Sequence, residues 1–374
     1  MKYLFITVTL ILTSLSSFAA TFCVSSSAEL ANALETAEDN GEDDHIRIQP
    51  GDYLTINNER FAFLNQEDHD LTISGGWTPF NQINCFFQLG TPLDTTIDGN
   101  DNSPVLYLQN NSVSSAKFTV SNMTIANGFS DNTAISGGLM FYTHNSQYSG
   151  EILIDRVLFL GNEGNNGAAL YQVGRGKVVI RNSVFMFNTT QNGNGSAYFS
   201  MDAEAAGLHF INNTLVFNNS GSASTAVTNV SGLLLNLNWD NGDTPDALIA
   251  NNLFWDQNTR DFYVTFSGGN TMLYNNNYEN GSGFFADTAN NLSLPPGLEP
   301  QLLNFTPAPG SPLNGKGLAM DDPLPLPTAF LESWDHGIED FDGGFTTRVA
   351  FGRVDIGAVE APWEGPIFAD GFDD

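Results

Sequence analysis

Residues Val178 to Asn188, VVIRNSVFMFN, contain the pattern that decides the fold of this chain, because related stretches recur along it. The copies begin at six positions, Val120, Ile154, Ile180, Ile211, Ile249 and Leu273. The first position of each copy is apolar, and so is the position five residues on. Recurrence of this kind indicates a repeat protein in which each unit buries its apolar side chains against its neighbours.

A turn position lies between the two apolar columns. It is occupied by Asn122, Arg156, Asn182, Asn213, Asn251 and Asn275. Asparagine tolerates a left-handed backbone, and its side-chain amide can bond to the repeat above and the repeat below. The asparagines of this column therefore predict a structural ladder.

The repeats contain no helical period, and a second strand start rich in small residues follows several copies, as at Gly167-Ala168-Ala169-Leu170. Short strands arranged in stacked circuits, about 4.8 Å apart, pair every backbone group with the coil above and below. The fold class predicted is all-β, a parallel β-helix solenoid.

The chain divides into four parts. Residues 1–19 have the charged start, apolar middle and small-residue end of a signal peptide, with no later stretch long enough to span a membrane. Residues 20–94 form an N-terminal cap and the first coils, and residues 95–285 form the β-helix repeats. Residues 286–374 are a proline-rich segment and tail, expected to cover the coils, since proline is excluded from central strands.

Two features belong to the N-terminal cap. Ser26 and Glu29 have the spacing of a capping box before an apolar-periodic stretch that ends near Asn40, which predicts a short helix closing the end of the stack. Cys23 and Cys85 are the two cysteines of a chain that the signal segment marks as exported, which favours a disulfide between them.

The formal net charge of −30 restricts the partners. Such a field repels nucleic acid and anionic surfaces, and it repels polyanionic polysaccharides unless bound calcium reverses the local sign. A polysaccharide or a cell-surface component remains as the expected partner, and nucleic acid does not.

The repeats also resemble a known group of proteins. Phe159-x-x-Asn162 with Gly167-Ala168-Ala169-Leu170, and Phe185-x-x-Asn188 with Gly195-Ser196-Ala197-Tyr198, resemble the FxxN and GGAI repeats of exported bacterial β-helix proteins, including polymorphic outer-membrane proteins. The first coil at 44–53 and the ending at 355–360 are similar to those of proteins grouped as choice-of-anchor Q.

This resemblance implies the right-handed, pectin-lyase-like form of the parallel β-helix. It also implies export to the periplasm, outer surface or exterior of a Gram-negative bacterium, with which the tail at Ile367 to Phe372 agrees. The group shares no common reaction, so no catalytic residue carries over.

An enzymatic alternative is a polysaccharide lyase or a glycoside hydrolase of pectin-lyase-like fold. The best charged group for it is Asp155, Arg156 and Arg181, but Asp155 and Arg181 share one column on adjacent coils, which favours a cross-strand ion pair. His209 is expected to face inward as an interior histidine. The catalytic residues are therefore unknown, and the sequence favours a non-catalytic protein.

Calcium is the one cofactor that the sequence suggests. Oxygen-bearing side chains alternate at Asp98, Asn100 and Asn102, as at the start of a calcium loop, although Gln109 stands where an EF-hand has its last acidic ligand. A plain turn is the alternative.

A ligand-binding surface is expected one residue beyond the second apolar column. Leu160, Met186, Phe217 and Trp255 occupy this column, which strand alternation directs outward. An exposed apolar strip would suit stacking on sugar rings or on a partner protein. The alternative is that the proline-rich segment covers the strip. The sequence thus predicts a secreted or surface-associated scaffold that binds polysaccharide or another surface.

Overall fold

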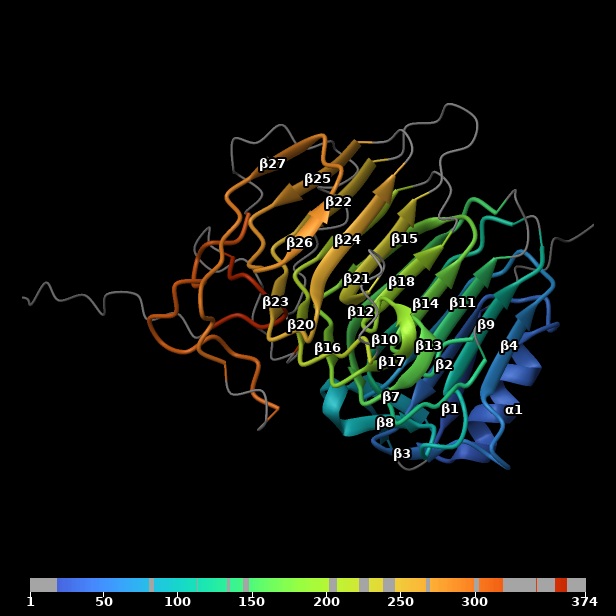
Figure 1. Ribbon diagram of the computed structural model, residues 1–374. Coiled ribbons are helices and arrows are strands. Elements are labelled where there is room, and N and C mark those ends of the chain that lie inside the picture. The colour runs from blue at the N-terminus through green and yellow to red at the C-terminus, as the bar shows by residue number, and fades with distance from the viewer. Residues whose placement is uncertain are drawn as a thin grey trace, which may run out of the picture.

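The computed structural model describes residues 19–80, 84–112, 114–132, 135–143, 148–201, 207–221, 229–237, 246–266, 270–298, 303–318, 341 and 354–361. The expected signal segment before Ala19 and the tail at 367–372 lie outside the described residues. Within them the chain is built mainly of parallel β-strands, stacked along one axis from the N-terminal to the C-terminal coils (Figure 1).

The larger sheet has 15 strands in two rows. The first row contains β1 (Ala20–Val24), β2 (Asp44–Ile48), β5 (Leu71–Ser74), β10 (Phe118–Ala126), β12 (Glu151–Leu160), β15 (Lys177–Arg181), β19 (Leu208–Ile211), β22 (Asp246–Ala250), β25 (Asn270–Tyr274) and β27 (Asp287–Ala289). The second row contains the ends of β10 and β12 together with β3 (Gly51–Leu54), β8 (Thr95–Asp98), β16 (Val184–Met186), β20 (Thr214–Val216) and β23 (Leu253–Trp255).

The second sheet lies across the core from the first. Its strands are β4 (Phe61–Asn65), β9 (Leu106–Asn110), β11 (Leu139–Thr143), β14 (Leu170–Val173), β18 (Tyr198–Met201), β21 (Val230–Leu237), β24 (Arg260–Phe266) and β26 (Gly281–Gly283), with β13 (Glu163–Asn166) and β17 (Thr189–Asn194) paired at one side. All pairings within the two sheets are parallel. An antiparallel hairpin, β6 (Trp77–Phe80) and β7 (Asn84–Gln88), stands apart from both sheets.

A left-handed residue marks the corner between the two rows of the larger sheet. The corner residues, all with φ between 49° and 57°, are Asn122, Arg156, Asn182, Asn212, Asn251 and Asn275. The predicted turn column is therefore found, with one correction: Asn212, and not Asn213, occupies the corner of its coil. The error arose because Asn212 and Asn213 are adjacent, so that the sequence permits two alignments.

The amide ladders form in columns other than the predicted one. Asn213 begins the first ladder, in which each backbone N–H donates to the side-chain oxygen of the next asparagine at 2.9–3.0 Å, through Asn252, Asn276 and Asn291. The second ladder connects Asn162, Asn188 and Asn218 at 3.0 Å and ends at Gln257. The side chains of Asn122, Asn182, Asn251 and Asn275 instead bond to other partners.

The main core lies between the sheets and contains the inward columns. Register pairs Ile180 with Phe210, and Phe210 with Ile249, so the fourth copy of the repeat is displaced by one residue from the predicted alignment. Phe210 is fully buried inside the coil, whereas Ile211 is buried on the outer face. Because both faces of this strand are apolar, alternation of polar and apolar residues could not fix its register.

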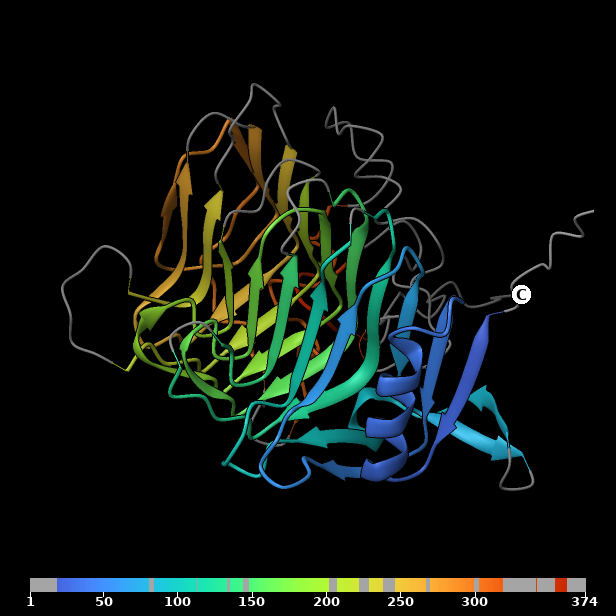
Figure 2. The same cartoon turned by 90° about the vertical axis from the view of Figure 1, so that its right-hand side faces the viewer.

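The N-terminal end is closed by helix α1 (Ser27–Ala37), the one α-helix among the described residues. The Ser26 Oγ accepts a hydrogen bond from the backbone N–H of Glu29, as the capping-box pattern predicts. Leu30, Ala33 and Leu34 are buried against the core, next to β1, β2 and β4 (Figure 2). A 3₁₀ turn covers Pro92–Asp94. The predicted disulfide between Cys23 and Cys85 is confirmed.

The first prediction concerns the second ladder. Asn188 is fully buried, and its amide donates to Phe159 O and Asn218 Oδ1 while its oxygen accepts from the amide of Asn162. Asn188→Ala should lower the free energy of unfolding by about 2–4 kcal/mol, because buried polar partners lose their bonds. Chemical denaturation measures this difference. Asn32→Ala, at an exposed helical position, is the control and should change it by less than about 0.5 kcal/mol.

Candidate functional site

The apolar strip expected to bind a ligand is covered by the C-terminal part of the chain. Met186 is 1% exposed, and Leu160 and Trp255 are partly buried, in a cluster with Phe305, Phe341, Ala358 and Val359. The backbone N–H of Ala358 also donates to Thr214 Oγ1 at 2.9 Å. Leu160, Met186 and Trp255 therefore contribute to packing, and the prediction that they form an exposed binding strip is wrong.

Phe217 belongs to a different column. Register pairs Leu160 with Met186, Met186 with Val216, and Val216 with Trp255. Phe217 lies one residue further along, at the second corner of the coil, where the chain leaves the larger sheet. The same column contains Asn127, Gly161, Phe187 and Asp256, all with φ between 51° and 65°.

Phe187 and Phe217 stack on each other outside the coils. Their ring centroids are 5.4 Å apart and their planes differ by 10°. Phe187 is 46% exposed, although the other large aromatic side chains of the repeats are mostly buried. Phe217 is partly buried because its ring also contacts the cluster beneath the C-terminal part.

These rings line a shallow groove of about 450 Å³, which we call the aromatic groove and define by Phe187, Phe217, Asn218, Asn219, Asp256 and Asn258. Asn218 is a buried member of the second amide ladder, so the floor of the groove is fixed. Asn258 Nδ2 donates to Asn219 Oδ1. Within the described part of the chain, this leaves Asn219 Nδ2, Asn258 Oδ1 and the Asp256 carboxylate without a protein partner at the groove.

Sequence reasoning selected Phe217 by a wrong alignment and missed Phe187, Asp256, Asn219 and Asn258. A signal was present in the sequence. Phe187 and Phe217 come directly before the ladder residues Asn188 and Asn218, at a position where the preceding coil has Gly161.

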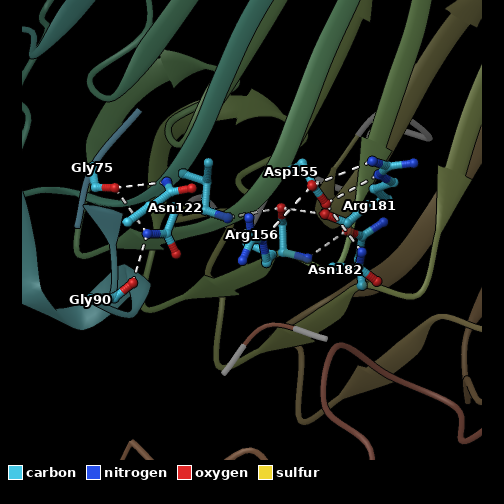
Figure 3. Close-up of polar contacts among 11 residues, drawn as sticks. Gly75, Gly90, Asn122, Asp155, Arg156, Arg181 and Asn182 are labelled. Atoms are coloured by element: carbon cyan, nitrogen blue, oxygen red, sulfur yellow. Dashed lines mark hydrogen bonds and ion pairs between the residues drawn. The ribbon is translucent and has the colours of Figure 1, made fainter. Parts of the chain in front are cut away.

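The charged group considered for catalysis forms a compact ion-pair cluster (Figure 3). Arg181 Nε lies 3.1 Å from Asp155 Oδ1, and Arg156 Nε lies 3.8 Å from Asp155 Oδ2. Asn182 Nδ2 donates to the same carboxylate at 3.1 Å. All three charged side chains are at most 16% exposed. The expected cross-strand pair of Asp155 and Arg181 is confirmed, and its contacts connect adjacent coils.

His209 does not face inward as expected. It pairs with Val179 and Leu248 in an outward column, because the whole copy is displaced by one residue. The side chain is nevertheless only 2% exposed. Burial, together with the positive charge of Lys177, lowers the pKa of His209 to about 3, so the ring is neutral at ordinary pH.

The suggested calcium ligands form a turn. Asp98 Oδ1 accepts from the backbone N–H of Asn100, Asp98 Oδ2 accepts from Asn127 Nδ2, and Asn102 donates to the carbonyl of Asn100. Asn100 has a left-handed backbone. Among the described residues, no group of three or more His, Cys, Asp or Glu side chains is arranged to hold a metal ion.

A second polar cluster lies on the outer face of the first coils. His45 Nδ1 accepts from Arg47 Nε at 3.2 Å, and His45 Nε2 lies 2.7 Å from Ser74 Oγ, which also accepts from Trp77 Nε1. The guanidinium of Arg47 lies 4.2 Å from the centre of the Trp77 ring. Burial and then the charge of Arg47 lower the pKa of His45 to about 4.

This pKa shift predicts a loss of stability in acid. In the unfolded chain a histidine has a pKa near 6.5, so between about pH 6.5 and pH 4 the unfolded state binds a proton that the folded state does not. The free energy of unfolding therefore falls as pH falls through this window. His45→Gln should reduce the difference in stability between pH 7 and pH 4 by about 1–3 kcal/mol, allowing for partial solvent exposure of the ring.

Thermal or urea unfolding at several pH values measures this effect, with His69→Gln as the histidine control. An unchanged pH profile in His45→Gln would show that His45 does not couple proton binding to folding.

Of the described helices, none is long and apolar enough to cross a membrane. Comparison of the chain with protein-family models, with curated proteins and with solved structures finds no match.

Proposed function

We propose that this protein is an exported, right-handed parallel β-helix scaffold that binds a neutral polysaccharide through the aromatic groove. The observation that carries the proposal is the stack of the exposed Phe187 ring on the partly buried Phe217 ring, held in a left-handed backbone at two successive coils. The signal-like segment at 1–19 and the repeat resemblance support export and handedness.

The backbone conformation of the two rings is costly. A bulky residue with positive φ is an outlier, and each such residue costs on the order of 1–3 kcal/mol unless the surroundings hold it. Glycine and asparagine fill the same column at Gly161 and Asn127 without this cost. Phenylalanine contributes nothing to the turn itself. Phe217 also packs against the cluster beneath the C-terminal part, so the largely exposed Phe187 ring is the one that favours a role at the surface.

The polar groups beside the rings suit a sugar. A pyranose presents an apolar C–H face to an aromatic ring and hydroxyl groups at its edge. Asp256 offers an acceptor to those hydroxyls, whereas Asn219 and Asn258 offer a donor and an acceptor. Sites of this composition, apolar with a few fixed polar groups, are typical of small-ligand recognition.

Charge favours a neutral glycan over an acidic one. Asp256 lines the groove, Glu163 lies on a nearby coil, and the whole chain carries −30. A uronate would approach these carboxylates against like-charge repulsion.

The two carboxylates are badly placed for hydrolysis. Glu163 pairs with Thr189 of the next coil, and Thr189 pairs with Asn219 of the coil after that. Asn219 in turn is hydrogen-bonded to Asn258, which lies on the third coil together with Asp256. Glu163 and Asp256 are thus separated by three coil spacings, or about 14 Å. A pair of catalytic carboxylates in a glycoside hydrolase lies about 5–9.5 Å apart. The groove is therefore proposed to bind and not to cleave.

The test replaces both rings by a residue suited to the turn. Phe187→Asn combined with Phe217→Asn should change the melting temperature little, since the tolerance of asparagine for positive φ offsets the contacts that the Phe217 ring loses with the cluster beneath the C-terminal part. The same variant should lose at least about tenfold in affinity for the retained glycan, because two apolar contact surfaces are removed. Affinity electrophoresis against a panel of neutral and acidic polysaccharides, followed by calorimetry, measures both changes.

Leu294→Ala, at an exposed position outside the groove, is the matched control and should bind as the wild type does. Equal retention by the double variant would contradict the proposal. Release of new reducing ends or of unsaturated products by the wild type would instead identify an enzyme.

A further prediction concerns charge selection in the aromatic groove. Asp256→Asn keeps the size of the side chain and the left-handed turn but removes the carboxylate. The variant should bind uronate-containing polysaccharide more strongly than the wild type, by a factor of about three to ten at low salt, and the difference should shrink as salt screens the charge. No change in the ratio of uronate to neutral glycan affinity would exclude Asp256 from the binding groove.

A further inference from the structure

A buried carboxylate, that of Asp44, stands in an apolar column of the core. Asp44 begins β2 and is 5% exposed. Strand register places it in the inward column of the larger sheet, whose next six members are all apolar: Leu71, Phe118, Ile152, Val178, Leu208 and Ala247. An ionised carboxylate is costly to bury without a partner of opposite charge. An acid at this point of the column therefore calls for a cation beside it.

The surroundings of Asp44 oppose its negative charge. Asn40 Nδ2 donates to Asp44 Oδ1 at 2.7 Å, but α1, which packs beside β2, buries only apolar side chains there. Burial raises the pKa of Asp44 to about 6, and the negative charges of Glu42 and Asp43 add to this rise. The charged residues around it, in its own turn and in the turn of the next coil, are Glu42, Asp43, His69 and Asp70.

The strand next to Asp44 begins at Ala20. Register pairs Ala20 of β1 with Asp44 of β2, and the backbone N–H of Ala20 donates to the carbonyl of Asp43 at 2.8 Å. Paired residues of neighbouring parallel strands lie about 4.8 Å apart. A positive charge on the nitrogen of Ala20 would therefore lie within reach of the Asp44 carboxylate. Ala19, directly before it, is exposed.

Removal of the signal-like segment would create such a charge. Ser17 and Ala19 are the small residues that a signal peptidase requires three places and one place before the bond it cuts. Hydrolysis of the Ala19–Ala20 amide consumes one water, leaves a carboxylate on Ala19 and leaves an ammonium group on Ala20. The uncut chain has an uncharged amide at the same place.

We propose that cleavage after Ala19 places the new α-ammonium group of Ala20 against the carboxylate of Asp44, and that this ion pair stabilises the N-terminal end of the stack. β1 is the first strand of its row and pairs with β2 alone, so its start gains most from an added contact. The exported chain is then more stable than its precursor. This inference rests on the export part of the proposed function and is independent of glycan binding.

The test compares two forms of the oxidised protein. One begins at Ala20, released from a fusion partner without extra residues, and the other keeps Phe18 and Ala19, which moves the ammonium group two residues away from Asp44. At pH 7 the form that begins at Ala20 should melt at least about 2 °C higher. Asp44→Asn should abolish this difference, because it removes the charge but keeps an acceptor for Asn40. Asp52→Asn, at an exposed position of β3, is the matched control and should keep it.

The difference between the two forms should also depend on pH. An α-amino group in an unfolded chain has a pKa of about 7.7–8.0, and the ion pair raises this pKa in the folded state. The advantage is therefore fully present below about pH 7.7 and is lost as pH rises through the folded pKa. It also disappears in acid, once Asp44 is protonated. The difference should thus be greatest near pH 7 and absent at about pH 10.

Equal melting temperatures of the two forms at pH 7, or a difference that persists in Asp44→Asn, would overturn the proposal. Mass spectrometry of the full-length chain after export should find a first residue of Ala20, and any other first residue would equally contradict it. A protein that binds no glycan but shows the melting difference would contradict the aromatic groove alone, so the two proposals fail separately.

Discussion

The buried asparagine amides that connect one coil to the next are the interaction on which the rest of this structure depends. A coil of short strands must turn at its corners, and the corner breaks the regular pairing between strands. In the coils that carry the ladders, an asparagine next to the left-handed residue donates to one neighbouring coil and accepts from the other, as Asn188 and Asn213 do. Each ladder thus replaces, at the corner, the backbone bonds that the strands make elsewhere.

The ladders also determine where a bulky residue with a left-handed backbone can be placed. A position beside a fully buried, fully bonded asparagine is held in place whatever its own preference, because the coil cannot relax without breaking bonds to two neighbours. Phe187 and Phe217 lie directly before such asparagines, and their left-handed backbone is tolerated for that reason. Rigid corners therefore allow the chain to stack aromatic rings at the spacing of the coils and to leave one of them, Phe187, exposed to solvent.

Much of the fold could be predicted from the sequence. The repeated apolar columns predicted the parallel β architecture, the capping pattern at Ser26 and Glu29 predicted the helix, and the two cysteines of the chain predicted the disulfide. The register of the copy around Phe210 was wrong, since Ile211 beside it is also apolar and buried on the outer face. Local alternation fixes register only where one face of the strand meets water.

The candidate site was harder to predict for a related reason. The C-terminal part of the chain covers the outer face of the larger sheet, so that an outward side chain such as Met186 is as buried as an inward one. Which column is covered depends on contacts between residues more than 100 positions apart, such as Thr214 with Ala358, and these leave no local pattern. The corner that carries the aromatic groove does have a local sequence signal, which is an aromatic residue directly before a ladder asparagine.

The covered outer face and the strongly acidic composition together limit how this protein can bind a partner. Much of the larger sheet's outer face is occupied by its own chain, and the net charge of −30 keeps anionic partners away from the remaining surface. Attraction between this protein and a partner is therefore expected from apolar contacts, at places on the surface where few carboxylates repel the partner. The aromatic groove combines two rings with a single lining carboxylate.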